Sequence, residues 1–293
     1  MKKLSFFLVA LLSMGLFFSS CVKDAKTVNP GYKLEEVGTN ATSLLELPMD
    51  VYLQADRAIR SQHDSIVAKS LNQASYTYTI DYLTITVAPA ILNAYPKTIT
   101  INFGTSTTTP YTGTLTITMT GDMYTAGNYC ALAYNNLVTN GSTIKGADSI
   151  FSLGLNSSGS YNYRFKLKDG EVLGYNSEKI SYSGNVYPKF NTTTKAYVMD
   201  SVLLNASDAG LNSYKMYSHK TYKLQKLSNC NYFNTGAINT EITVGGVLVG
   251  NMAFDFSYST TGVTDDCDAY GAIYANGLNS YQNSFAFLAK KFQ

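Results

Sequence analysis

Residues 76–87 read YTYTIDYLTITV, and the pattern of this stretch decides the fold class. Aromatic and apolar side chains occupy every second position, first at Tyr76, Tyr78 and Ile80 and then at Leu83, Ile85 and Val87. A period of two is typical of a β-strand, because successive side chains point to opposite faces of a sheet. The alternation changes phase inside the stretch, which predicts a β-bulge or a bend near Tyr82.

Similar alternation recurs along the chain, with turn signals between the runs. The further alternating sets are Ile99-Ile101-Phe103, Leu115-Ile117-Met119, Tyr161-Tyr163-Phe165-Leu167 and Met252-Phe254-Phe256-Tyr258. The turn signals are Asn140-Gly141, Asp169-Gly170, Gly245-Gly246 and Asn276-Gly277. Of these, Asp169-Gly170 predicts a hairpin most sharply. Many short strands at this spacing predict an all-β protein, either an antiparallel sandwich or an extended meander of ten or more strands.

One segment has the spacing of a helix. Residues 49–66 place apolar side chains three or four positions apart, and Asp50 is a candidate N-terminal cap. The predicted domain therefore covers residues 47–293, with one short N-terminal helix before the strands. A likeness between two hairpin-like stretches allows two related halves divided near residue 200, although any two hairpins look alike.

The composition is poor in charge and rich in tyrosine. Charged residues make up 14% of the chain, and there are 24 Tyr and no Trp, which favours β structure. Lys2 and Lys3 lie in a segment that we expect to be removed, so the 22 basic residues fall to 20 and balance the 20 acidic ones. A neutral chain without a clustered basic patch argues against nucleic acid or an anionic membrane surface as a partner.

The N-terminus resembles a bacterial lipoprotein signal. Two lysines precede the apolar stretch 4–18, which is too short for a transmembrane helix, and Phe18-Ser19-Ser20-Cys21 looks like a Bacteroidetes lipobox. The resemblance implies that residues 1–20 are removed and that Cys21 is acylated, for example with palmitate; cleavage that leaves a free Cys21 is the alternative. Residues 21–46 lack periodicity and predict a flexible tether. The Lys23-Asp24 signal resembles those that send lipoproteins to the cell surface, and a periplasm-facing anchor stays open.

Four stretches together resemble an uncharacterised group of Bacteroidetes lipoproteins. They are residues 96–104 (PKTITINFG), 113–117 (GTLTI), 134–141 (YNNLVTNG) and 227–236 (LSNCNYFNTG), the last followed by a strand and by Cys267-Asp268. The resemblance spans most of residues 95–277 and contains no catalytic motif. It implies a secreted, lipid-anchored all-β protein, and it implies no activity.

With Cys21 acylated, three cysteines remain, so at most one disulfide forms within the chain. Cys230 and Cys267 both lie beside polar loop residues in the last third of the chain, and they are the expected pair. Cys130 lies in an apolar run and is expected to be a buried thiol. The two histidines, His63 and His219, have no local signature of thiol catalysis.

Asp265, Asp266 and Asp268 form the densest acidic cluster. Their carboxylates are a weak candidate for Ca²⁺, but the spacing is not that of a calcium loop, and an acidic hairpin turn is the interpretation that we favour. We therefore predict no metal and no cofactor. No hydrolase motif or evident carboxylate pair is present in the sequence, so we expect no enzyme, and a hydrolase with an unusual site stays as an alternative.

Two further patterns bear on the role of the protein. Ser65, Ser149 and Ser201 each follow Asp and precede an apolar residue, which resembles O-glycosylation sites of Bacteroidetes and requires exposed serines. The excess of tyrosine suits either recognition surfaces or strands that pack on one face.

These observations favour a non-enzymatic lipoprotein of the outer membrane, displayed on the cell surface, that serves as a structural or protein-interaction module. The expected partners are the membrane, through the N-terminal lipid, and an envelope protein or a glycan. The alternative is a glycan-binding surface lipoprotein of a nutrient-uptake system.

Overall fold

The computed structural model describes residues 30–104, 111–139, 142–173, 179–209, 212–227, 230, 233–244, 247–257, 270–277 and 282–288. In these residues one helix accompanies a predominantly β structure, so the predicted all-β class with an N-terminal helix is confirmed. The chain forms two compact units, residues 1–37 and 38–293. No helix of the described part is long and apolar enough to cross a membrane.

The strands of the second unit form one large antiparallel sheet, which corresponds to the extended meander and not to the sandwich. The order across the sheet is β18-β17-β16-β15-β13-β12-β11-β10-β9-β7-β6-β5-β3-β2, with β14 paired to β12 and β8 paired to β7. The sheet is not closed, because β2 and β18 each pair with one neighbour among the described strands. A separate two-stranded sheet joins β1 and β4.

The strand bounds follow the alternation in the sequence. The strands are β1 Asn72–Gln73, β2 Tyr76–Ile80, β3 Leu83–Ala88, β4 Ala90–Ile91, β5 Lys97–Asn102, β6 Tyr111–Met119, β7 Tyr129–Thr139, β8 Ser142–Thr143, β9 Ser149–Leu155, β10 Ser160–Leu173, β11 Lys179–Asn191, β12 Tyr197–Asp208, β13 Asn212–Ser218, β14 Leu224–Lys226, β15 Ala237–Val244, β16 Val247–Asp255, β17 Tyr270–Gly277 and β18 Gln282–Leu288. In β3, β5 and β6 the alternating apolar residues are fully buried, as the period of two predicts.

The phase change near Tyr82 has a different cause from the one predicted. The chain reverses direction there: Ile80 pairs with Leu83, and Asp81 and Tyr82 form a two-residue turn between β2 and β3. Asp81 takes a positive φ of 51°, which aspartate tolerates in tight turns. The prediction of a bulge or bend within one strand is therefore wrong. A hairpin with a two-residue turn also shifts the alternating apolar side chains from even-numbered to odd-numbered positions.

The hairpin predicted at Asp169-Gly170 is also wrong. β10 continues through both residues, and its pairing with β11 shifts register between Leu167 and Gly170, which is a β-bulge. Asp169 has a φ of 52°, and a Cβ atom on Gly170 would lie 2.3 Å from the ring of Tyr182. The residues that favour a turn thus favour the bulge equally, because both need a positive φ and a close approach of the backbone.

The other turn signals have mixed outcomes. Asn140-Gly141 and Gly245-Gly246 lie outside the described residues, but the strands on either side pair as a hairpin requires, Thr139 with Ser142 and Val244 with Val247. Asn276-Gly277 forms the last two residues of β17 and not a turn. The sheet is also continuous through residue 200, because β12 pairs with both β11 and β13. The division into two related halves near that residue stays a prediction.

Helix α2 (Pro30–Lys69) includes the predicted segment 49–66 and extends beyond it at both ends. Residues 30–46, expected to belong to a tether, are helical, and Leu44 and Leu45 are fully buried. Tertiary packing outweighs Pro48, which removes one backbone donor inside the helix but does not end it. Asp50 consequently lies in the helix interior and is not an N-terminal cap.

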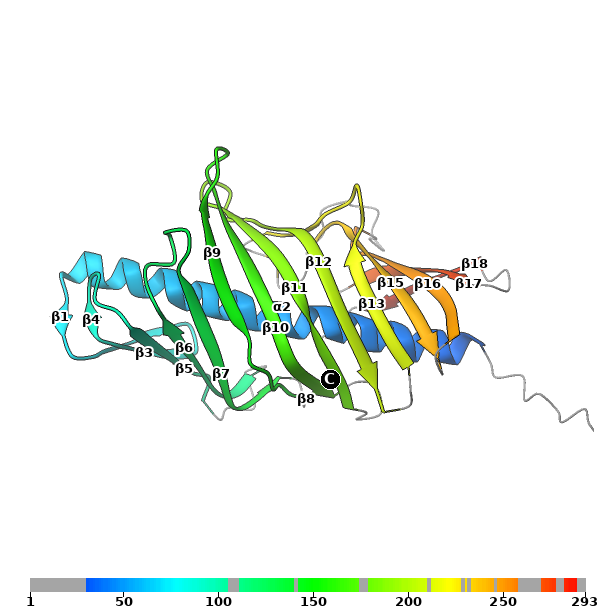
Figure 1. Cartoon of the computed structure of the whole chain (residues 1–293), viewed down its shortest axis with the longest axis horizontal. Helices are drawn as coiled ribbons and strands as arrows, with labels where there is room; N and C mark the ends of the chain where they lie inside the picture. The colour runs from blue at the N-terminus through cyan, green and yellow to red at the C-terminus, as the bar shows by residue number, and fades with distance from the viewer. Residues whose placement is uncertain are drawn as a thin grey trace, which may run out of the picture. The chain divides into compact units, whose positions relative to one another are not determined.

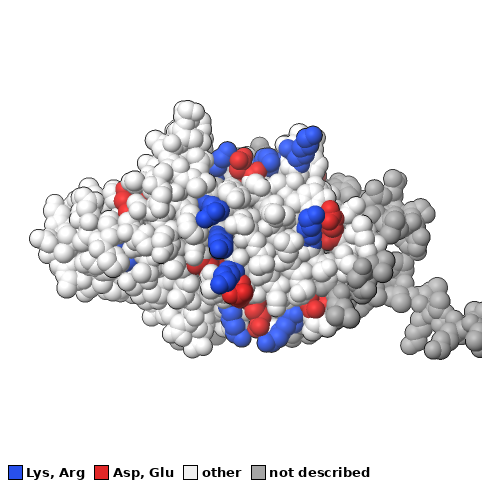
Figure 2. All heavy atoms as spheres, in the orientation of Figure 1, with Lys and Arg blue, Asp and Glu red and all other residues white. Residues whose placement is uncertain are grey.

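From residue 38 onward, α2 crosses the strands on one side of the sheet (Figure 1). Its buried side chains recur at helical spacing and face the inward side chains of the strands: Leu44, Leu45, Tyr52, Ala55, Ile59 and Ile66. The core therefore lies between α2 and the sheet. The face of the sheet turned to the viewer in Figure 2 carries few charges, in keeping with the composition.

Candidate functional site

Tyrosine hydroxyl groups from five strands form hydrogen bonds with side chains of α2. These hydrogen bonds join Tyr214 on β13 to Asn40, Tyr111 on β6 to Asp50, Tyr197 on β12 to Asp56, Tyr163 on β10 to Arg60, Tyr78 on β2 to Ser61, and Tyr76 on β2 to Lys69. β2 supplies two of these six contacts, which are spread along the helix. Six of the 24 tyrosines therefore serve the contact between helix and sheet, in agreement with the packing interpretation of the composition.

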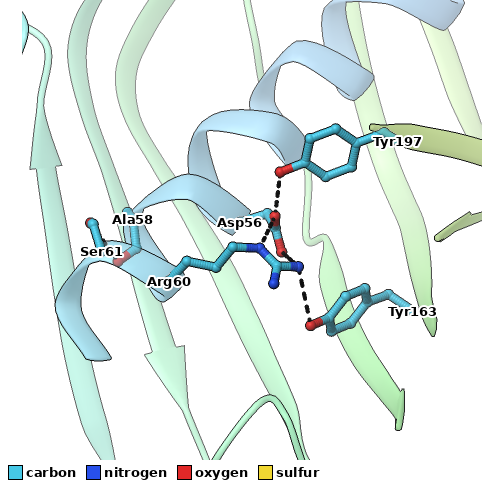
Figure 3. Close-up of polar contacts among 6 residues, drawn as sticks. All are labelled: Asp56, Ala58, Arg60, Ser61, Tyr163 and Tyr197. Carbon is cyan, nitrogen blue, oxygen red and sulfur yellow. Dashed lines mark hydrogen bonds and ion pairs between the residues drawn. The ribbon is translucent and has the colours of Figure 1, made fainter. Parts of the chain in front are cut away.

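Asp56 and Arg60 form a largely buried ion pair in this contact (Figure 3). One helical turn separates them, and Arg60 donates from Nε to Asp56 Oδ2 at 2.7 Å and from Nη2 to Oδ1 at 2.9 Å. Tyr197 donates its hydroxyl to Asp56 Oδ2 at 2.5 Å, and Arg60 Nη2 donates to the hydroxyl of Tyr163 at 3.4 Å. The carboxylate thus receives three hydrogen bonds, and only 4% of the Asp56 side chain is exposed.

The guanidinium of Arg60 also lies among aromatic rings. Its Cζ is 3.7 Å from the ring centre of Phe190 and within 6 Å of the rings of Tyr124, Tyr161 and Tyr163. Burial alone lowers the pKa of Arg60, but the neighbouring Asp56 carboxylate raises it above its usual value. Burial, followed by the charge of Asp56, raises the pKa of Tyr197. Arg60 therefore stays charged, and Tyr197 stays protonated.

A cleft of about 590 Å³ opens beside this cluster. It lies between α2, the β2–β3 turn, and the ends of β11, β12 and β14. Its lining residues are Asp50, Leu53, Gln54, Arg57, Arg60, Ser61, Asp64, Ile80, Asp81, Tyr82, Tyr111, Phe190, Lys195, Tyr197, Lys226, Leu227 and Cys230. The volume falls in the range of small-molecule binding sites.

Most charges in the cleft are already paired. Asp50 accepts a hydrogen bond from Tyr111 at 2.9 Å and lies 3.7 Å from the ammonium of Lys226. Arg57 forms an ion pair with Asp81 at the rim, where both side chains are substantially exposed. Burial and the Asp50 carboxylate raise the pKa of Tyr111. Because each of these carboxylates is neutralised by a cation, the cleft favours a neutral, polar ligand.

Two polar groups of the cleft lack a partner among the described residues. Lys195, an exposed residue, forms no ion pair with any of them. The amide oxygen of Gln54 is buried and accepts no hydrogen bond. The exposed ring of Tyr82, 41% accessible, lies in the same cleft. Together they offer a donor, an acceptor and an aromatic face to a ligand.

The cysteines largely lie outside this site. Cys130 is free and fully buried in β7, as expected, and burial raises the pKa of its thiol to about 12. Cys230 is disulfide-bonded, 5% exposed, and part of the cleft wall. Cys21 and Cys267 lie outside the described residues, so the acylation and the pairing of Cys230 with Cys267 stay predictions.

The three serines of the predicted glycosylation motif differ in exposure. Ser201 is exposed on β12, whereas Ser65 on α2 and Ser149 on β9 are half-buried. The Asp before Ser149 has a structural role: Asp148 is 1% exposed and accepts hydrogen bonds from the hydroxyl of Tyr134 at 2.5 Å and from the backbone N–H of Lys168 at 3.0 Å. Exposure therefore favours Ser201 as a modification site.

The acidic and histidine candidates remain separate from the cleft. Asp265, Asp266 and Asp268 lie outside the described residues. Within the part that is described, no group of three His, Cys, Asp or Glu side chains could hold a metal ion. His63 packs against the ring of Tyr124, and Nδ1 of His219 accepts backbone N–H groups of its own turn.

The chain matches no family model, no curated protein and no solved structure. The resemblance to Bacteroidetes lipoproteins therefore stays a prediction. The cleft residues were not found from the sequence, because the contacts that shape them join residues far apart, such as Asp56 and Tyr197. The one local signal of the buried polar cluster was the helical spacing of Tyr52, Asp56 and Arg60, which places three polar side chains on the same face of the helix as the core residues.

Proposed function

We propose that this chain is a lipid-anchored protein of the outer membrane that acts as a non-enzymatic interaction module and holds its partner in the cleft beside α2. The observation that carries the proposal is the pairing of two of the three carboxylates that line the cleft: Asp50 with Lys226 and the Tyr111 hydroxyl, and Asp81 with Arg57. Acid–base catalysis needs a carboxylate that can exchange a proton with its substrate. A carboxylate already held in an ion pair is better suited to orienting a ligand.

A second candidate is glycan binding, as in a nutrient-uptake system, and the composition of the cleft favours it. Sugars present apolar C–H faces together with many hydroxyl groups. The ring of Tyr82 suits such a face, while the Arg57–Asp81 pair and the amide of Gln54 offer donors and acceptors for the hydroxyls. The balance of charges in the cleft favours neutral sugars over acidic ones.

Glycan-array binding with purified protein lacking residues 1–21 tests which partner the cleft holds. If the partner is a glycan, Tyr82→Ala and Arg57→Ala abolish binding, and Tyr222→Ala leaves it unchanged. Tyr222 is a matched control because it is 61% exposed and does not line the cleft. If no glycan binds, a photo-crosslinker at position 82 is expected to trap one defined envelope protein, which the same crosslinker at position 222 does not trap. A wild type that shows neither result would contradict the proposal.

The anchor is tested independently in cells. Metabolic labelling with radioactive palmitate is expected to mark the wild type and not Cys21→Ser, and the variant is expected to leave the membrane fraction. Protease shaving of intact cells then distinguishes the two faces of the membrane: degradation indicates surface display, and protection indicates a periplasm-facing anchor.

A further inference from the structure

Three basic side chains form a row on the outer face of β10. Arg164, Lys166 and Lys168 occupy alternate positions of this strand, and the residues between them, Phe165 and Leu167, are buried on the opposite face. Alternate residues of a strand lie about 7 Å apart, so the row is straight and extended. Figure 2 shows a row of basic side chains near the middle of this face, with further basic and acidic side chains around it.

These cations are almost free of carboxylate partners. Within the described chain, neither Arg164 nor Lys166 takes part in a salt bridge, and Nε of Arg164 has no hydrogen-bond partner. Lys168 lies 3.8 Å from Asp169, where both side chains are mostly exposed and the attraction is weak in water. The guanidinium of Arg164 is held 4.3 Å from the ring centre of Phe151, its cross-strand neighbour. Three like charges in a row attract a ligand with several negative charges along its length.

The positions beside Lys166 carry hydroxyl and amide groups. Lys166 lies between Ser149 of β9 and Asn185 of β11 in the register of the sheet. Ser183, two positions from Asn185 on the same face of β11, is exposed. Such groups form hydrogen bonds with sugar hydroxyls, whereas the neighbour of Arg164 on β9 is the ring of Phe151.

We propose that the row of Arg164, Lys166 and Lys168 binds a linear acidic polysaccharide that lies along β10, with its carboxylates on the cations and its hydroxyls on the flanking serine and asparagine side chains. The site goes beyond the proposed function, because it lies on the outer face of the sheet and uses no residue of the cleft. A single small anion does not fit the row, because one phosphate or carboxylate cannot contact cations at three successive outward positions in an extended strand.

Binding of purified protein, again lacking residues 1–21, to polygalacturonate, a linear polyuronate, tests this site. The wild type is expected to bind polygalacturonate in low salt and to release it as the salt concentration rises. It is expected not to bind dextran, which is neutral. The triple variant Arg164→Gln/Lys166→Gln/Lys168→Gln is expected to lose at least about tenfold in affinity and to show a shallower dependence on salt. Circular dichroism and thermal unfolding check that the variant is folded.

A matched variant removes the same charge elsewhere. Lys215→Gln/Lys220→Gln/Lys223→Gln lowers the net charge by three at positions outside the row and is expected to bind as the wild type does. An equal loss in both variants would show that net charge alone is responsible and would overturn the site. Absence of polygalacturonate binding, or tighter binding to single-stranded DNA or to anionic vesicles, would overturn the ligand class. Tyr82→Ala, which tests the cleft, is expected to leave polygalacturonate binding unchanged, so failure of one site is distinguishable from failure of the other.

Discussion

At the scale of single residues, the Asp56–Arg60 pair is held in place by contacts from both the helix and the sheet. Two hydrogen bonds join the pair within α2, and Tyr197 and Tyr163 add one each from β12 and β10. A buried ion pair contributes modest net stability, because desolvation of both charges offsets much of their attraction. Removal of one partner lowers the stability strongly, because it leaves the other charge buried and uncompensated.

A double-mutant cycle on this pair is expected to be strongly non-additive. Asp56→Asn and Arg60→Met should each lower the free energy of unfolding by about 3–5 kcal/mol, and the double variant by clearly less than the sum. Urea denaturation of the four proteins at pH 7 measures the coupling. Additive losses would mean that the two side chains do not act as a pair.

Asp148 makes the stability depend on pH. Burial raises the pKa of this carboxyl from its usual 3.8 to about 6, although Tyr134 and the backbone of Lys168 donate hydrogen bonds to it. The folded protein therefore binds a proton between pH 4 and pH 6 that the unfolded chain releases. Stability contributed by this group is present below about pH 4 and is lost as the pH rises through 6.

The variant Asp148→Asn isolates this effect. The difference in free energy of unfolding, wild type minus variant, is expected to be about 2–3 kcal/mol larger at pH 4 than at pH 7.5. Denaturation at several pH values measures the difference, and other carboxyls cancel because both proteins contain them. A difference that is independent of pH, or that grows as the pH rises, would refute the assignment.

At the scale of elements, α2 depends on the sheet for its stability. Its first half has few signals of an isolated helix, yet Leu44, Leu45 and Leu47 are buried. An amphipathic helix gains most of its stability from the surface it packs against. Residues 38–46 are therefore an integral part of the second unit and not a spacer.

Truncation of a core side chain in this half tests the point. Leu45→Ala is expected to lower the free energy of unfolding by about 2–5 kcal/mol, because Leu45 is fully buried. Val67→Ala on the same helix is the control, with an expected change within about 0.5 kcal/mol, because Val67 is 50% exposed. If the segment were a tether, both substitutions would be equally mild.

The sequence predicted strands better than it predicted turns and helix ends. The alternation at Leu83, Ile85 and Val87 reports burial directly, because every second residue of a strand faces the core. The pair Asp169-Gly170 was misleading, since a positive φ suits a bulge as well as a hairpin. The helix start was missed because packing against strands that follow much later in the chain determines it, and no local pattern records such contacts.

At the scale of the whole molecule, the second unit has one large open sheet with a helix across one face and, in our proposal, two separate ligand surfaces. The cleft lies beside the helix, and the basic row of β10 lies on the opposite face of the sheet. The cleft exists only where α2 stays on the sheet, because its lining residues come from both. The contact between α2 and the sheet therefore determines whether the cleft forms.

Replacement of tyrosine by phenylalanine measures that contact most directly. Tyr111→Phe and Tyr197→Phe remove hydroxyls bonded to helix carboxylates, and each is expected to lower the free energy of unfolding by about 1.5–3 kcal/mol in urea denaturation. Tyr182→Phe is the matched control, because the hydroxyl of Tyr182 is buried without a hydrogen-bond partner. This control is expected to leave the stability unchanged or to raise it slightly. Equal losses in all three variants would contradict the claim that strand tyrosines hold α2 on the sheet.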